Sequence, residues 1–118
     1  MPAPYFGSFT DRKQMLGEFA EPYGLLPTDI VLFAKYDVAW YDGCAHVLIQ
    51  RDADLYEVRA SHCSCDGLEH QWKPQYVTWK ALALGLDEYL NTCKFEPPES
   101  TKYYNELVIQ HMESSYFA

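Results

Sequence analysis

The stretch from residue 30 to residue 62 restricts the fold most, because apolar and polar side chains alternate along much of it. Alternation with a period of two is typical of a strand that buries one face. Asp42-Gly43 is a strong signal for a two-residue hairpin turn, and Arg51-Asp52-Ala53-Asp54 predicts a second turn. The sequence therefore predicts consecutive antiparallel strands over about residues 30–41, 44–50 and 55–60.

The two predicted turns define one register, which can be compared with the side-chain pattern. They pair Val38 with Val47 and Val47 with Val58, and one face of the sheet is then apolar or aromatic throughout. Its side chains are Tyr36, Val38, Trp40, Ala45, Val47, Ile49, Tyr56, Val58 and Ala60. The other face is mostly polar. A slip of one residue would scramble this division, so the agreement of both turns supports the predicted meander.

Helical patterns lie on both sides of the meander. A short helix capped by Thr10 or Ser8 precedes it, the strongest pattern runs from about residue 77 to 92, and Ser100 caps a last helix. We expect the apolar stripe of the 77–92 helix to cover the apolar face of the sheet. The expected fold is a single α+β domain over residues 1–118: a three-stranded antiparallel meander packed by helices, in the order helix, three strands, helix, helix.

The charge of the chain restricts its partners. A formal charge of −8, from 17 acidic and 9 basic residues, repels nucleic-acid phosphates and anionic lipids. We therefore expect no direct nucleic-acid partner, no membrane, and a protein partner with a basic surface. The alternative is that the charge only keeps a small protein in solution. The predicted binding residues are acidic or aromatic side chains expected at the surface: Asp37, Asp52, Asp54, Glu57, Glu69 and Trp72.

The expected location is the cytoplasm. No segment approaches the roughly 20 apolar residues of a membrane span. The first residues, Met1-Pro2-Ala3-Pro4-Tyr5, lack the basic and apolar regions of a signal peptide. The 4 cysteines are fewer than small disulfide-dependent secreted domains usually carry. We expect reduced thiols, and an even number of cysteines also allows two disulfides.

A second kind of site is suggested by Ser61-His62-Cys63-Ser64-Cys65. In the predicted register, Cys44, Cys63 and Cys65 project from one face of the sheet, together with His46. Three thiols and an imidazole form a possible ligand set for zinc. The alternative is that the sulfur atoms pack as small apolar groups, because the chain has no Cys-x-x-Cys knuckle.

A thiol-dependent enzyme is a third hypothesis. His62 and Cys63 are adjacent, so on a strand they point to opposite faces and cannot form a catalytic pair; His46 or His70 would have to serve. His62 has the parity of the apolar face, and His111 lies on an apolar helix stripe. We expect both to be core histidines bonded to backbone carbonyls.

The segment Ser61-His62-Cys63-Ser64-Cys65-Asp66-Gly67-Leu68-Glu69-His70-Gln71-Trp72 resembles a group of small uncharacterised proteins encoded by tailed bacteriophages and prophages. The likeness covers roughly residues 36 to 86 and includes the helix start Trp79-Lys80-Ala81-Leu82. In that group, position 66 is often aromatic and position 70 often small, whereas this chain has Asp66 and His70. The resemblance implies an accessory protein acting inside a bacterium, and it carries over no catalytic residue.

Charge and resemblance together predict a non-enzymatic inhibitor of host defence, such as an anti-CRISPR protein. It would bind a basic surface of a host or defence-system protein in the host cytoplasm, without a cofactor. The first alternative is a small zinc-binding domain that uses Cys44, Cys63 and Cys65, and the second is the thiol-dependent enzyme.

Overall fold

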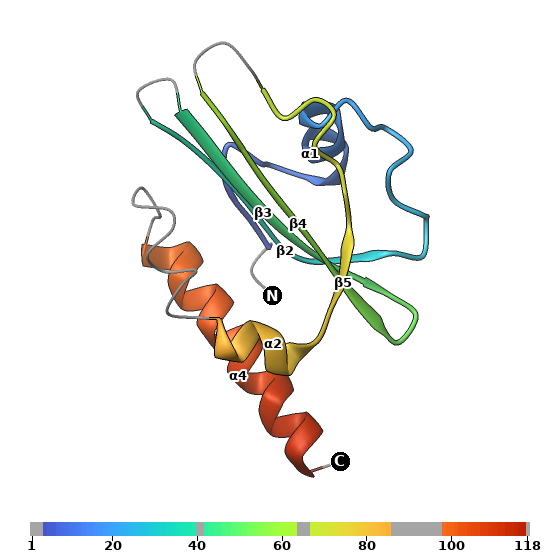
Figure 1. The fold of residues 1–118 in the computed structure, drawn as a ribbon, viewed down its shortest axis with the longest axis vertical. Coiled ribbons are helices and arrows are strands. Elements are labelled where there is room, and N and C mark those ends of the chain that lie inside the picture. The colour runs from blue at the N-terminus through green and yellow to red at the C-terminus, as the bar shows by residue number, and fades with distance from the viewer. Residues whose placement is uncertain (1–3, 40–41, 64–66, 86–97, 118) are drawn as a thin grey trace.

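A five-stranded sheet lies between helices in the computed structural model, which Figure 1 shows as a ribbon. The structure describes residues 4–39, 42–63, 67–85 and 98–117. The strands are β1 (Tyr5–Gly7), β2 (Ile30–Ala39), β3 (Asp42–Arg51), β4 (Asp54–His62) and β5 (Gln75–Val77). The helices are α1 (Arg12–Glu18), α2 (Trp79–Leu84) and α4 (Pro98–Phe117).

The order of the strands in the sheet is their order in the sequence. β1 runs parallel to β2, and the other neighbouring pairs are antiparallel. The predicted three-stranded antiparallel meander is therefore wrong, because the sheet is five-stranded and mixed, within the predicted α+β class. The two missed strands, β1 and β5, have 3 residues each, too few for an alternating pattern to be recognised.

The two predicted hairpin turns had different outcomes. Arg51 pairs with Asp54, so Asp52-Ala53 form the second turn as predicted, and Asp52 adopts a left-handed φ of 56°. In the first hairpin Ala39 pairs with Asp42, so the predicted turn Asp42-Gly43 is wrong and these residues belong to β3.

Close packing explains the glycine that was taken for a turn residue. A Cβ atom on Gly43 would lie 2.1 Å from Nε2 of His62, so only glycine lets the histidine ring approach β3 here. Val38 pairs with Gly43 instead of Val47, a shift of four positions. An even shift leaves each side chain on its predicted face. Trp40, predicted on the apolar face, lies outside the described residues.

The predicted apolar face packs against α1 and residues 68–72. The buried cluster on this side comprises Phe9, Met15, Leu16, Phe19, Leu25, Ala34, Tyr36, Ala45, Val47, Ile49, Val58, Ala60 and Leu68. Tyr56 packs against it, whereas Val38 is 51% exposed. The expectation that the 77–92 helix covers this face is wrong. α1 covers it, and Asp11 rather than Thr10 or Ser8 caps that helix by accepting a hydrogen bond from Gln14 N.

α2 and α4 cover the opposite face of the sheet (Figure 1). Their cluster with the strands comprises Phe33, Leu48, Leu55, Leu82, Tyr104 and Val108. A register shift between Val31 and Phe33 marks an irregularity in β2. α2 is shorter than the predicted helix; Thr78 caps it, and residues 86–97 lie outside the described part. Within the described ranges, no helix is long and apolar enough to span a membrane.

Candidate functional site

The six predicted binding residues lie in three separate parts of the molecule. Asp52 and Asp54 are exposed at the turn between β3 and β4. Asp37 and Glu57 lie on the face that α4 covers; Asp37 is 6% exposed, so its expected surface position is wrong. Glu69, exposed, and Trp72, half-buried, lie beside α1 at the other end of the sheet. The structure therefore does not bring the six together.

Trp72 closes the edge of the core on the α1 side. Its ring meets Phe19 edge-on, with centroids 5.0 Å apart, and its Nε1 donates a hydrogen bond to the carbonyl of Gly24 at 3.2 Å. A Cβ on Gly24 would lie 2.7 Å from that nitrogen. Trp72 thus fastens the segment before β5 to the loop after α1, which is a packing role.

A row of polar side chains lies on the face covered by α4; three of them are buried, Glu57 is half-buried and Arg59 is exposed. Nζ of Lys35 lies 3.4 Å from Oδ2 of Asp37. Nε2 of His46 lies 2.8 Å from Oε2 of Glu57, and Nε of Arg59 lies 3.1 Å from the same oxygen. We call these five residues the polar row. The sequence pattern showed that this face is mostly polar but not that it is buried.

The protonation of the polar row follows from burial. Burial lowers the pKa of His46, against the opposing effect of its hydrogen bond to Glu57, so the imidazole is neutral near pH 7 and Nε2–H donates to the carboxylate. Burial acts to raise the pKa of Glu57, but the hydrogen bonds from His46 and Arg59 lower it overall. The rings of Phe33 and Tyr104 lie 5.7 and 5.3 Å from that of His46, whose side chain is only 2% exposed.

Tyr36 and His62 form a hydrogen-bonded pair on the α1 side. His62 Nδ1–H donates to the Cys63 carbonyl at 2.9 Å, so the Tyr36 hydroxyl donates to Nε2 at 2.6 Å. Burial raises the pKa of Tyr36, and the carboxylates of Glu18 and Glu69 raise it further, which keeps the hydroxyl protonated. The predicted bond of His62 to a backbone carbonyl is confirmed, but its expected place in the core is wrong, because the side chain is only half-buried.

His111 is also bonded to a backbone carbonyl, as predicted. Its Nδ1 lies 2.8 Å from the oxygen of Leu107, one turn earlier in α4. The ring stacks on Trp79 of α2 with centroids 4.0 Å apart and an angle of 14° between planes. This stack joins the two helices at the surface and orients the indole.

The cysteines differ in state. Cys44 is disulfide-bonded, so the expectation of reduced thiols is wrong for this residue, while Cys63 is exposed and is not part of a disulfide. Cys65 and Cys93 lie outside the described residues. A disulfide sulfur is not a thiolate ligand, which removes Cys44 from the predicted zinc set in this state. In the part of the chain that the structure describes, no three His, Cys, Asp or Glu side chains form a metal site.

The arginines of the chain are bonded to other groups of the same chain. Arg51 makes a bidentate contact with the buried Asp29, at 2.9 and 2.7 Å. Arg12 donates to the carbonyls of Leu26 and Asp29, and Arg59 bonds to Glu57. Because the arginines are engaged in these contacts, the charge of the surface is set mainly by the other ionisable side chains.

Carboxylates dominate the described surface. Those exposed are Asp11, Glu18, Glu21, Asp42, Asp52, Asp54, Glu69, Glu99 and Glu106. Within the same residues, the exposed basic side chains are Lys13, Arg59, Lys73, Lys80 and Lys102. Because Arg59 is bonded to Glu57, nine carboxylates stand against four lysines.

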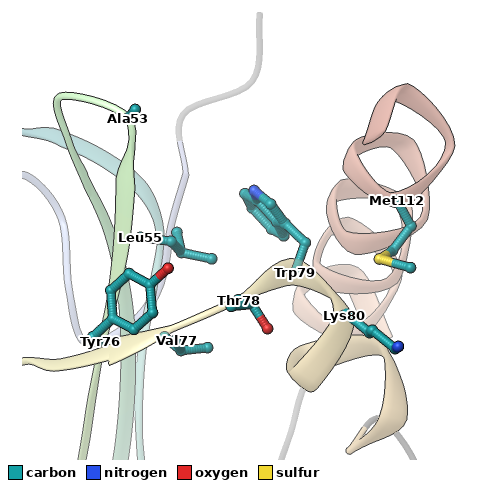
Figure 2. A pocket seen from close by; sticks show the side chains of 8 residues that line it. All are labelled: Ala53, Leu55, Tyr76, Val77, Thr78, Trp79, Lys80 and Met112. Carbon is teal, nitrogen blue, oxygen red and sulfur yellow. The ribbon is translucent and has the colours of Figure 1, made fainter. Parts of the chain in front are cut away.

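A pocket of about 400 Å³ that was not evident from the sequence lies beside the β3–β4 turn. Ala53, Leu55, Tyr76, Val77, Thr78, Trp79, Lys80 and Met112 line it. Figure 2 shows Tyr76 and Leu55 on one side and Trp79 and Met112 on the other. The run of aromatic and β-branched residues at 76–79 was a signal for a short strand here, but its partner strand was not evident from the pattern.

The chain matches no protein-family model, and neither a curated protein nor a solved structure matches it. Its function therefore has to be argued from the chemistry of its surface.

Proposed function

We propose that the protein is a non-enzymatic inhibitor of a bacterial defence system, similar in action to an anti-CRISPR protein. It docks its acidic surface on a basic surface of a protein target in the host cytoplasm. The observation that carries this proposal is the excess of exposed carboxylates over exposed lysines. The phage setting comes from the resemblance of the segment from Ser61 to Trp72.

Internal pairing concentrates the negative charge on the surface. Ion pairs consume Lys35, Arg51 and Arg59 together with three carboxylates, so the net charge of −8 falls on the remaining side chains. A field of one sign speeds encounter with an oppositely charged partner and rejects partners of like charge. A groove that binds nucleic acid in a defence protein carries the complementary positive charge. The acidic protein would compete with nucleic acid for that groove.

The proposed location has a consequence for the cysteines. Thiol reductants keep most cysteines reduced in a bacterial cytoplasm. Cys44 is therefore expected as a thiol there and as a disulfide after aerobic purification. Inhibition should persist when Cys44 is replaced by serine, since the proposed surface does not include it.

A plaque assay tests the proposal directly. Bacteria with an active CRISPR-type system that targets a phage would express the protein, and plaquing should rise by about 100-fold or more over an empty vector, as expected when a tight inhibitor removes most of the active effector. Asp52→Asn with Asp54→Asn should weaken the effect, and the matched pair Lys73→Gln with Lys102→Gln should not. Unchanged plaquing across a panel of defence systems contradicts the proposal.

A salt titration tests the electrostatic part. Raising the salt from about 0.01 M to about 0.1 M shortens the Debye length from roughly 30 Å to roughly 10 Å. The affinity of the purified complex with its target should fall about tenfold over this range, mainly through slower association. An affinity that does not change with salt would mean that charge does not guide the docking.

A further inference from the structure

The pocket beside the β3–β4 turn has two braced aromatic walls. Tyr76, which is 64% exposed, meets Tyr56 edge-on at 6.1 Å. Trp79 is stacked on His111, which leaves its other surface to the pocket. Figure 2 shows both rings beside Leu55 and Thr78. Rings that are already held in place lose little side-chain entropy when a ligand group enters.

Two carboxylates neighbour the pocket along the chain. Asp52 and Asp54 are exposed and flank Ala53, which lines it. Lys80 also lines the pocket, and in Figure 2 its amine points away from Tyr76 and Leu55. The pocket therefore combines aromatic faces with two exposed carboxylates next to one of its lining residues, and both features attract a cation.

One arginine of the chain itself already makes such a contact near the pocket. The guanidinium of Arg51 lies 5.7 Å from the ring centroid of Tyr56, and Asp29 holds it in a bidentate contact. Tyr56 in turn contacts Tyr76 at the pocket. The arrangement of aromatic ring, guanidinium and carboxylate is thus present one side chain away from the pocket.

We propose that this pocket binds an arginine side chain projecting from the basic surface of the protein partner. The inference rests on the proposed function for the identity of the partner, and it names the group that the partner inserts. The guanidinium plane stacks on Tyr76 or Trp79, the methylene stem packs against Leu55 and Met112, and the carboxylates of Asp52 and Asp54 beside Ala53 attract the charge.

Arginine fits these walls better than other side chains. Its planar, weakly hydrated guanidinium stacks on rings and bonds to carboxylates, whereas the lysine ammonium is compact and strongly hydrated. An apolar side chain would gain nothing from Asp52 and Asp54. A phosphate or a carboxylate would be repelled by them.

An NMR titration of the full chain with N-acetyl-arginine methylamide tests the site. Saturable shifts are expected for the Trp79 indole N–H and for the backbone amides of Ala53 to Leu55. The indole of Trp72, which is bonded to Gly24 away from the pocket, is the internal reference. The lysine analogue should bind at least about fivefold more weakly than the arginine analogue. The leucine analogue should not shift the indole signal.

Matched variants locate the binding. Tyr76→Ala removes an exposed wall and should weaken arginine binding about fivefold. Tyr23→Ala, which removes a tyrosine that is 94% exposed elsewhere, should leave it unchanged. Asp52→Asn with Asp54→Asn should also weaken it; asparagine tolerates the φ of 56° at position 52. Folding of each variant is checked by the dispersion of its spectrum.

The proposal is overturned if the arginine probe shifts no pocket signal, if leucine or lysine binds equally well, or if folded Tyr76→Ala binds like the parent chain. The probe needs no target, so the result is independent of the plaque assay. Arginine binding without any effect on plaquing would retain the site and remove the proposed function. Inhibition without arginine binding would retain the function and remove this pocket.

Discussion

The two faces of the sheet use the same strands in different ways. The face toward α1 is apolar along its length, with the Tyr36–His62 pair at one end. The face toward α4 is apolar at one end and carries the polar row beside it. The comparison shows that a polar strand face can still be buried when its charges are paired and a helix covers them.

The largest difference between the faces should appear when a charge of the polar row is removed. Asp37→Ala leaves the ammonium of Lys35, which is 0% exposed, without the carboxylate 3.4 Å away. We expect the free energy of unfolding to fall by about 3–5 kcal/mol, measured by urea denaturation.

A double substitution is the control for that change. Lys35→Met with Asp37→Leu removes both charges and keeps similar volumes, so the stability should return to within about 1 kcal/mol of the parent chain or exceed it. If the double variant were as unstable as Asp37→Ala, charge pairing alone would not explain how Lys35 and Asp37 affect the free energy of unfolding. The comparison of the two faces would then be wrong.

The pH dependence of the stability should show a smaller effect of the α4 face, which carries His46 and Glu57. The pKa of His46 is lowered from its ordinary 6.5. Above pH 6.5 the imidazole is neutral in both the folded and the unfolded chain, so it does not change the stability there. As the pH falls below 6.5, the unfolded chain binds a proton that the buried imidazole refuses, and stability falls by up to about 1.4 kcal/mol per pH unit. The lowered pKa of Glu57 continues the loss below 4.5.

Matched histidine variants assign this slope. His46→Gln keeps an N–H donor for Glu57 and should flatten the dependence between pH 6.5 and about 5. His70→Asn, at an exposed position with a φ of 67°, should leave the slope unchanged. An unchanged slope in His46→Gln would assign the proton uptake to another group.

The smallest effect is expected on the α1 face. Tyr36→Phe removes the hydroxyl that donates to His62 and preserves the ring packed 5.3 Å from Phe9. Because His62 is only half-buried, water can replace the lost partner, and we expect a loss of about 1 kcal/mol, measured by urea denaturation. A loss above about 3 kcal/mol would show that this face depends on its polar pair as strongly as the other.

The candidate sites were less predictable than the strands. Asp52 and Asp54 were expected at the surface and lie there, because a tight hairpin turn and the charged residue after it lie at the end of the sheet, outside the core. Asp37 and Glu57 lie on the polar face that the alternation predicted, yet the first is buried and the second half-buried. Period-two alternation shows which side chains share a face, and it does not show which element covers that face.

The sequence by itself determined the β2–β4 strands, the turn at Asp52-Ala53, the division of side chains between faces and the acidic charge, because these depend on local periodicity and composition. The tertiary structure decided the edge strands β1 and β5, the helix that covers each face, the pairing of the arginines and the aromatic pocket. Those features depend on contacts between residues far apart in the chain. A local pattern carries no information about them until the chain has folded.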